Sequence, residues 1–225
     1  MVFLNRDWLR KNWLRVVAHA GSLLPLAWLV WAYTQDLFLV DPVREITTFT
    51  GKTAIILLIL SLACTPFITL TGWKPVGRVR RALGLYAFLY AGLHFLTFVG
   101  LDYGFDPELI WGGIFAQRYV VVGFAAGLIL LTLALTSTRG WQKRLRRNWK
   151  RLHRLVYLAG ILVAVHVMWL SKDPSEPLRY VVVIALLLAL RLPPVRKAIS
   201  QARQRLTAWA RRPFGPSENP KSLDW

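Results

Sequence analysis

Six long apolar stretches, separated by short polar connections, limit most strongly how this chain can fold. They cover residues 16–33, 50–71, 82–100, 119–137, 152–170 and 178–192, and Pro193 and Pro194 end the last one. A helix needs roughly 20 apolar residues to cross the hydrocarbon core of a bilayer. Lipid offers the backbone no hydrogen bonds, so such stretches must be helical. The sequence therefore predicts an all-α polytopic membrane protein, a six-transmembrane-helix bundle over 16–194, with a basic segment at 1–15 and a basic tail at 195–225.

The charges alternate along the chain. The formal net charge is +18, from 29 Lys and Arg residues against 11 Asp and Glu residues. Basic residues cluster before the first stretch and after the second, fourth and sixth. The other three connections carry acidic residues, among them Asp41, Asp106 and Glu176. The positive-inside rule places both termini in the cytoplasm. Short basic clusters between apolar runs are typical of membrane loops, so we expect contact with membrane lipid and no nucleic acid.

Four histidines lie in or beside these stretches, at two depths. At about 1.5 Å per residue, His94 lies roughly 18 Å along the third stretch and His166 roughly 20 Å along the fifth. Both stretches run from the inside to the outside, so the two imidazoles are expected at similar depth in the outer half of the bilayer. His153 and His19 are expected near the cytoplasmic side.

An imidazole in hydrocarbon is costly unless it has a partner, so each histidine is a candidate functional group. The simple alternative is a hydrogen bond to a neighbouring helix. A pair of neutral imidazoles on facing helices is what a six-coordinate haem iron requires. Zinc fits less well, because it needs a third or fourth ligand and no Asp, Glu or second Cys lies at that depth. Cys64 is the one cysteine, expected to be a small buried side chain.

The inner pair is less regular than the outer pair. His153 and His166 are 13 residues apart, since 166 − 153 = 13, which places them about 140° apart around an ideal helix. We therefore expect the His94–His166 pair to be better formed than a His19–His153 pair. Gly92, Gly123 and their neighbours offer room for a flat macrocycle, although small residues also serve plain helix packing.

Several stretches resemble a known family. RRALGLYAFLYAGLHFLTF at 80–98 and RLHRLVYLAGILVAVH at 151–166 are similar to the haem-binding third and fifth spans of the MsrQ family. QRYVVVGF and LALTSTRGWQKRLRRNWKRLHRL resemble its fourth span and the following loop. The resemblance covers the whole six-span region, and this family belongs to the ferric-reductase-like transmembrane superfamily.

The resemblance implies a bacterial inner-membrane electron-transfer subunit rather than the catalytic subunit of its complex. Such a subunit binds haem b, with one or two haems, and takes electrons from quinone. It passes them to a periplasmic molybdopterin-containing methionine sulfoxide reductase that repairs oxidised proteins. The family is also known to bind FMN. Its haem histidines fall on His94, His153 and His166, whereas His19 is a candidate on depth alone.

Other functions remain open from the residues themselves. A ferric or cupric reductase would need a flavin and nicotinamide domain for which the chain has no room. A haem-free transporter would use the histidines as proton or metal sites, but transporters usually show internal repeats, and none is evident here. A cofactor-free membrane anchor is the third alternative. A visible absorption spectrum separates haem binding from the last two.

Overall fold

The computed structural model describes residues 6–38 and 40–210, and these form helices joined by short connections. In chain order the elements are α1 (Arg6–Thr34), α2 (Pro42–Thr71), η1 (Lys74–Arg78), α3 (Arg80–Thr97), η2 (Phe98–Asp102), α4 (Pro107–Ala116), α5 (Arg118–Leu135), α6 (Arg139–Leu152), α7 (Leu155–Leu170), α8 (Ser175–Ala189) and α9 (Pro193–Ala210). The predicted all-α membrane fold is confirmed. The predicted basic segment at 1–15 and basic tail at 195–225 lie partly outside this range.

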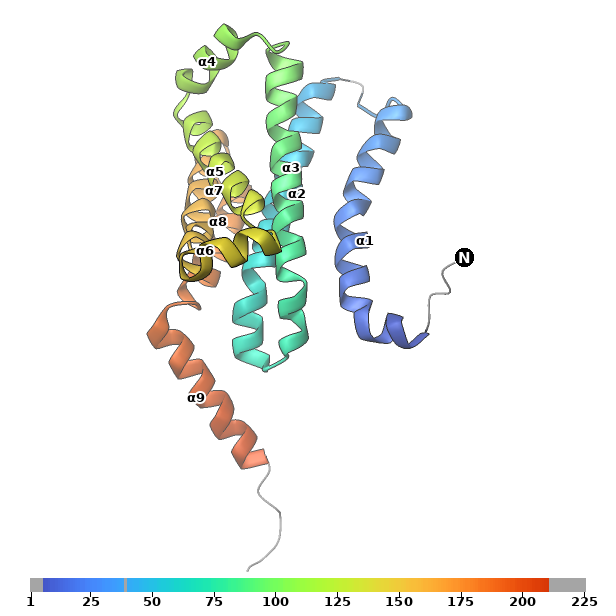
Figure 1. The fold of residues 1–225 in the computed structure, drawn as a ribbon. Coiled ribbons are helices and arrows are strands. Elements are labelled where there is room, and N and C mark those ends of the chain that lie inside the picture. The colour runs from blue at the N-terminus through green and yellow to red at the C-terminus, as the bar shows by residue number, and fades with distance from the viewer. Residues whose placement is uncertain (1–5, 39, 211–225) are drawn as a thin grey trace, which may run out of the picture.

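Helix α2 lies at the centre of the bundle. It packs along α3, and it also contacts α8 and α9, while α5 packs along α7 (Figure 1). The buried core is made mainly of small and aliphatic residues from α2, α3, α5 and α7, including Leu58, Leu62, Ala87 and Ala159. Cys64 is 3% exposed within this core, as its apolar surroundings predict. Small side chains allow helix backbones to approach closely where lipid supplies no hydrophobic driving force.

Four helices are long and apolar enough to cross a membrane by themselves, namely α1 from Asn12, α2, α3 with η2, and α5. The fifth and sixth predicted spans correspond to α7 and α8, which have 16 and 15 residues. At 1.5 Å per residue each is only about 24 Å long or less. Each continues at a bend, of 50° between α6 and α7 and of 74° between α8 and α9. The described residues thus contain four candidate spans, or up to six if each bent pair counts as one.

Two helices lie in connections where none was predicted. Helix α4 follows the third span, and its N-cap residue Asp106 accepts hydrogen bonds from the backbone N–H groups of Glu108 and Leu109. Several of its apolar side chains are exposed, with Trp111 at 65% and Phe115 at 58%, whereas Ile114 is buried. Helix α6 carries most of the basic residues of the fourth connection. Helix α4 lies at one end of the bundle, and α9 leaves the opposite end (Figure 1).

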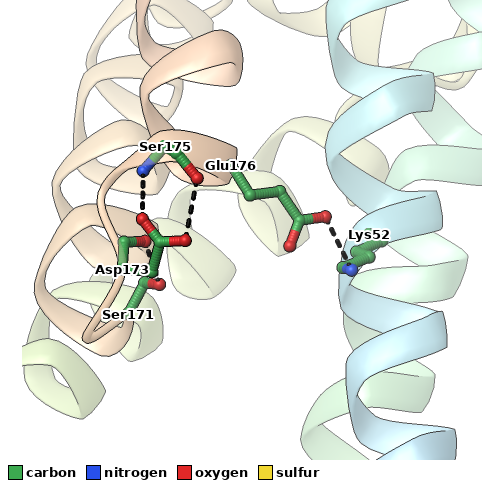
Figure 2. Close-up of polar contacts among 5 residues, drawn as sticks. All are labelled: Lys52, Ser171, Asp173, Ser175 and Glu176. Carbon is green, nitrogen blue, oxygen red and sulfur yellow. Dashed lines mark hydrogen bonds and ion pairs between the residues drawn. The ribbon is translucent and has the colours of Figure 1, made fainter.

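Polar contacts fasten the start of α8 to α2 (Figure 2). The Lys52 ammonium lies 2.7 Å from the Glu176 carboxylate, with both side chains about half exposed. Exposed pairs of this kind contribute at most about 1 kcal/mol. Asp173 accepts hydrogen bonds from the backbone N–H and the hydroxyl of Ser175, which hold the pKa of that carboxyl below its usual range. This connection therefore fixes the position of α8 near the α4 end of the bundle.

Candidate functional site

His94 on α3 and His166 on α7 face each other across the bundle. Their ring centroids are 6.3 Å apart and their planes meet at 83°. Both side chains are partly buried. The structure therefore brings together the two histidines for which the sequence predicts a common depth.

Each of the two rings is held by a backbone carbonyl of a neighbouring helix. Nδ1 of His94 lies 2.9 Å from the carbonyl oxygen of Thr47 on α2. Nδ1 of His166 lies 2.7 Å from the carbonyl oxygen of Tyr119 on α5. A carbonyl oxygen only accepts hydrogen bonds, so in each ring Nδ1 carries the proton. Nε2 of each ring then presents its lone pair, which is the arrangement that second-shell partners impose on metal-ligating histidines.

The distance between the rings fits a metal held between two Nε2 atoms. A metal–imidazole bond is about 2 Å long, so two such bonds in line place the ring centroids about 6 Å apart. Within the described ranges, no group of three or more His, Cys, Asp or Glu side chains gathers at one place. A pair of neutral imidazoles suits a metal whose other four ligands come from its own macrocycle, so these two residues fit an axially ligated haem.

His94 has a further brace that His166 lacks. The Thr97 hydroxyl donates to the carbonyl oxygen of His94. Oγ1 of Thr47 lies 3.0 Å from Oγ1 of Thr97, and the Thr47 hydroxyl donates to the carbonyl oxygen of Val43, 2.7 Å away. Thr47 therefore holds the His94 ring through its backbone carbonyl, and Thr97 contacts the His94 backbone. The sequence gives no sign of these partners, because neither threonine belongs to a ligand motif.

His153 lies at the break between α6 and α7, as the C-cap residue of α6. Its Nε2 is 3.2 Å from the hydroxyl oxygen of Thr136. The ring of Trp149 stacks on the imidazole with centroids 4.1 Å apart, and the Trp149 indole N–H donates to the carbonyl oxygen of Thr136. The structure thus places His153 in a compact cluster with Thr136 and Trp149 at the α5–α6 corner.

His19 lies on the exposed surface of α1. Its Nδ1 is 2.9 Å from the hydroxyl oxygen of Tyr86 on α3. A hollow of about 460 Å³ beside it is lined by Asn12, Arg15, Val16, His19 and Ala20. The structure therefore gives His19 and His153 different partners.

The glycines that were expected to admit a macrocycle face different surroundings. A Cβ atom placed on Gly92 would meet nothing within 4 Å. One placed on Gly123 would collide with the His166 ring, so the space at Gly123 is filled by an imidazole. The sequence analysis missed a second glycine of this kind, Gly51, which lies against His94.

These features define a class of protein, the helical multi-pass membrane proteins that hold paired imidazoles inside the bundle. Residues 50–164 match the profile of the family described as ferric reductase like transmembrane component. The chain is 44% identical to the protein-methionine-sulfoxide reductase heme-binding subunit MsrQ of Xanthomonas axonopodis pv. citri, over 92% of this chain and 95% of that protein. It is 43% identical to the subunit of the same name from Rhodospirillum rubrum, over 80% of this chain and 88% of that protein. The chain belongs to the MsrQ family of ferric-reductase-like transmembrane proteins, which confirms the resemblance found in the sequence.

Proposed function

We propose that this protein is a haem-binding membrane subunit that carries electrons through the bilayer for a methionine sulfoxide reductase. The observation that carries the proposal is the His94–His166 pair, with rings 6.3 Å apart and both Nδ1 atoms committed to backbone carbonyls. The relatives support it, because their name describes a heme-binding subunit of such a reductase.

Haem b bound there would supply a one-electron couple between ferric and ferrous iron. The chain's own part is ligation and orientation. Thr47 and Tyr119 hold the two ligand rings through their backbone carbonyls. His153 is the third candidate ligand from the family resemblance, and a second haem would require its Nε2 to turn away from Thr136. FMN stays a prediction from the resemblance, with no residues assigned to it.

The proposed orientation follows the charges. The basic connections at the α9 end of the bundle lie in the cytoplasm with both termini, and the α4 end faces the periplasm of a bacterial inner membrane. His94 and His166 then lie toward the periplasmic side, where a molybdopterin-containing reductase would collect the electrons. This assignment explains why the ligand pair lies on the outward half of α3 and α7.

The direct test is the spectrum of protein purified from membranes. We expect a Soret band in the oxidised form and sharp α and β bands after reduction. Co-expression with the periplasmic reductase subunit should then support reduction of methionine sulfoxide in a peptide, driven by a membrane quinol. A colourless, folded protein would instead favour a haem-free transporter or a membrane anchor.

The electron donor in this proposal is a quinol dissolved in the membrane. The hollow beside His19 is lined by residues of α1 alone, and His19 also forms the hydrogen bond to Tyr86 of α3. Oxidation of a quinol to a quinone releases two electrons and two protons. The ferric haem would take the electrons one at a time, and the His19 imidazole would accept one of the two protons.

Replacing His19 by alanine is expected to slow haem reduction by a water-soluble quinol at least about tenfold, the low end of what a positioned acid or base contributes. Reduction by dithionite should stay complete, because His19 does not touch His94 or His166. Stopped-flow absorbance at the reduced α band measures both rates. Val17→Ala, on the exposed surface of α1 but outside the hollow, is the matched control. If His19→Ala reacts with the quinol as fast as Val17→Ala, the quinol binds elsewhere.

A further inference from the structure

The two facing histidines are held by the same local arrangement, built twice. In each case Nδ1 meets the carbonyl oxygen of a residue on a neighbouring helix, and a glycine follows that residue four positions later. For His94 the two residues are Thr47 and Gly51, both on α2. The second arrangement, around His166, uses Tyr119 and Gly123 on α5.

The two arrangements are in register along the chain. The carbonyl residue precedes its histidine by 47 positions in both. Every member of the second set lies 72 positions after its counterpart in the first, since 166 − 94 and 123 − 51 both equal 72. The surrounding residues differ, with TTFTGKT at 47–53 against YVVVGFA at 119–125. The repetition is therefore one of geometry, which explains why no repeat is evident from the residues.

Helix geometry explains why a glycine occupies the fourth position. The carbonyl of residue i already accepts a hydrogen bond from the N–H of residue i+4, and it has a second lone pair. The side chain of residue i+4 leans toward the helix N-terminus and covers that carbonyl. A glycine there leaves the oxygen open, so a donor from a neighbouring helix can reach it.

The space at both glycines is filled by the imidazole itself. A Cβ atom on Gly123 would lie 2.6 Å from Nδ1 and 2.7 Å from Cε1 of His166. A Cβ atom on Gly51 would lie 3.1 Å and 3.2 Å from the same atoms of His94. Both glycines lie inside helices and neither has a positive φ, so neither is required by the backbone. We therefore attribute the presence of glycine at both positions to the close contact with the histidine ring.

We propose that Gly51 and Gly123 are positioning residues that set the tautomer and the ring plane of the two ligand histidines. Together with the carbonyls of Thr47 and Tyr119 they hold the imidazoles nearly perpendicular, with Nε2 of each ring directed away from its carbonyl. The inference rests on the proposed function in taking these histidines as ligands of haem. The glycine–imidazole contact itself exists with or without that group.

The first test is spectroscopic and uses Gly123→Ala, Gly51→Ala and, as control, Gly112→Ala. Gly112 is exposed on α4, and a Cβ there meets nothing within 4 Å. The oxidised wild-type protein should give the highly anisotropic low-spin electron paramagnetic resonance signal of perpendicular imidazole planes. Gly123→Ala should change this signal, shift the reduction potential and lower haem retention at least about tenfold, as loss of second-shell support does. Gly51→Ala should do the same to a smaller degree, and Gly112→Ala should match wild type.

The second test is a double-mutant cycle on thermal unfolding, with Gly123→Ala made in the wild-type and the His166→Ala backgrounds. In the wild-type background we expect the midpoint temperature to fall, because the new methyl group displaces the imidazole. In the His166→Ala background the fall should vanish, because the colliding ring is gone. Equal effects in both backgrounds, or a Gly123→Ala protein with an unchanged resonance signal and potential, would overturn the inference. A wild-type protein that binds no haem would overturn the proposed function, and the cycle would still decide on the contact.

Discussion

Replacing either His94 or His166 by alanine is expected to remove the haem absorption of the purified protein. An axial ligand contributes directly to the bond with iron, so its loss should exceed the roughly 10–100-fold loss of affinity that follows removal of an outer-shell partner. The remaining histidine cannot compensate, because its ring lies on the opposite helix and is held there by a hydrogen bond to a backbone carbonyl of a neighbouring helix. Pyridine haemochrome content per protein, measured after membrane extraction, gives the result.

Two further variants separate ligation from folding. His166→Met keeps a ligand at the same position, and we expect it to retain haem with a raised reduction potential, as methionine ligation does in other haem proteins. His19→Ala removes an imidazole whose hydrogen bond goes to Tyr86 and to neither ligand ring, so haem content should equal that of wild type. If His94→Ala and His166→Ala retain a full complement of haem with an unchanged spectrum, the paired-ligand site is wrong.

The spans could be predicted from the sequence because apolar length alone decides them. The runs at 16–33, 50–71, 82–100 and 119–137 lie within α1, α2, α3 with its η2 extension, and α5 with the residues that follow it. The helices extend further where polar residues continue them, as in α2, which begins at Pro42 rather than near residue 50. Hydropathy does not detect such extensions. The sequence does contain a signal for the start of α2, because Asp41 is a favourable N-cap residue and Pro42 is favourable in the first turn. In the structure Asp41 accepts a hydrogen bond from the Arg44 N–H.

The same signal marks helix α4, which was missed. Asp106, Pro107 and Glu108 form a capping residue, a first-turn proline and a first-turn acid in succession. In the structure this helix presents Leu109, Trp111 and other apolar side chains to the outside. A search for spans passes over it because it has only 10 residues.

The common level of His94 and His166 along their helices was predictable, and their hydrogen-bond partners were not. A rise of 1.5 Å per residue is enough to bring His94 and His166 to one level, because both helices run in the same direction. The partners are the backbone carbonyls of Thr47 and Tyr119, and every residue has a backbone carbonyl. Which carbonyls accept the hydrogen bonds therefore depends on the rotation of α2 and α5 relative to α3 and α7, which the sequence does not show. The role of Gly51 can be recognised only from the structure, which places it against the His94 ring.

The spacing of His153 from His166 was interpreted on the assumption of one continuous helix. The chain instead turns at His153 and Arg154, and α6 meets α7 at 50°. The angle of about 140° from an ideal helix therefore does not describe the relation of these two side chains. His153 belongs to the corner formed with Thr136 and Trp149, which a periodicity argument cannot predict.

Replacing Tyr90 by alanine is expected to lower the stability of the protein by about 3–5 kcal/mol, as for other large aromatic side chains removed from a core. Tyr90 is completely buried, and its hydroxyl donates to the carbonyl oxygen of Ser22 on α1 over 2.8 Å. Helix α1 stands at the side of the bundle (Figure 1) and exposes much of its length, with Leu24 at 66% and Tyr33 at 63%. The Tyr90 contact is therefore a principal attachment of α1, since helix association in lipid depends on packing and interhelical hydrogen bonds.

Two controls divide this effect between packing and the hydrogen bond. Tyr90→Phe keeps the ring and should cost only about 1 kcal/mol, the net value of one hydrogen bond. Tyr33→Ala removes the same kind of side chain from an exposed position on α1 and should change stability by less than about 0.5 kcal/mol. Thermal unfolding in detergent, followed by tryptophan fluorescence, ranks the three variants. If Tyr90→Ala unfolds at the same temperature as Tyr33→Ala, the Tyr90 contact is not a principal attachment and α1 is held by other contacts.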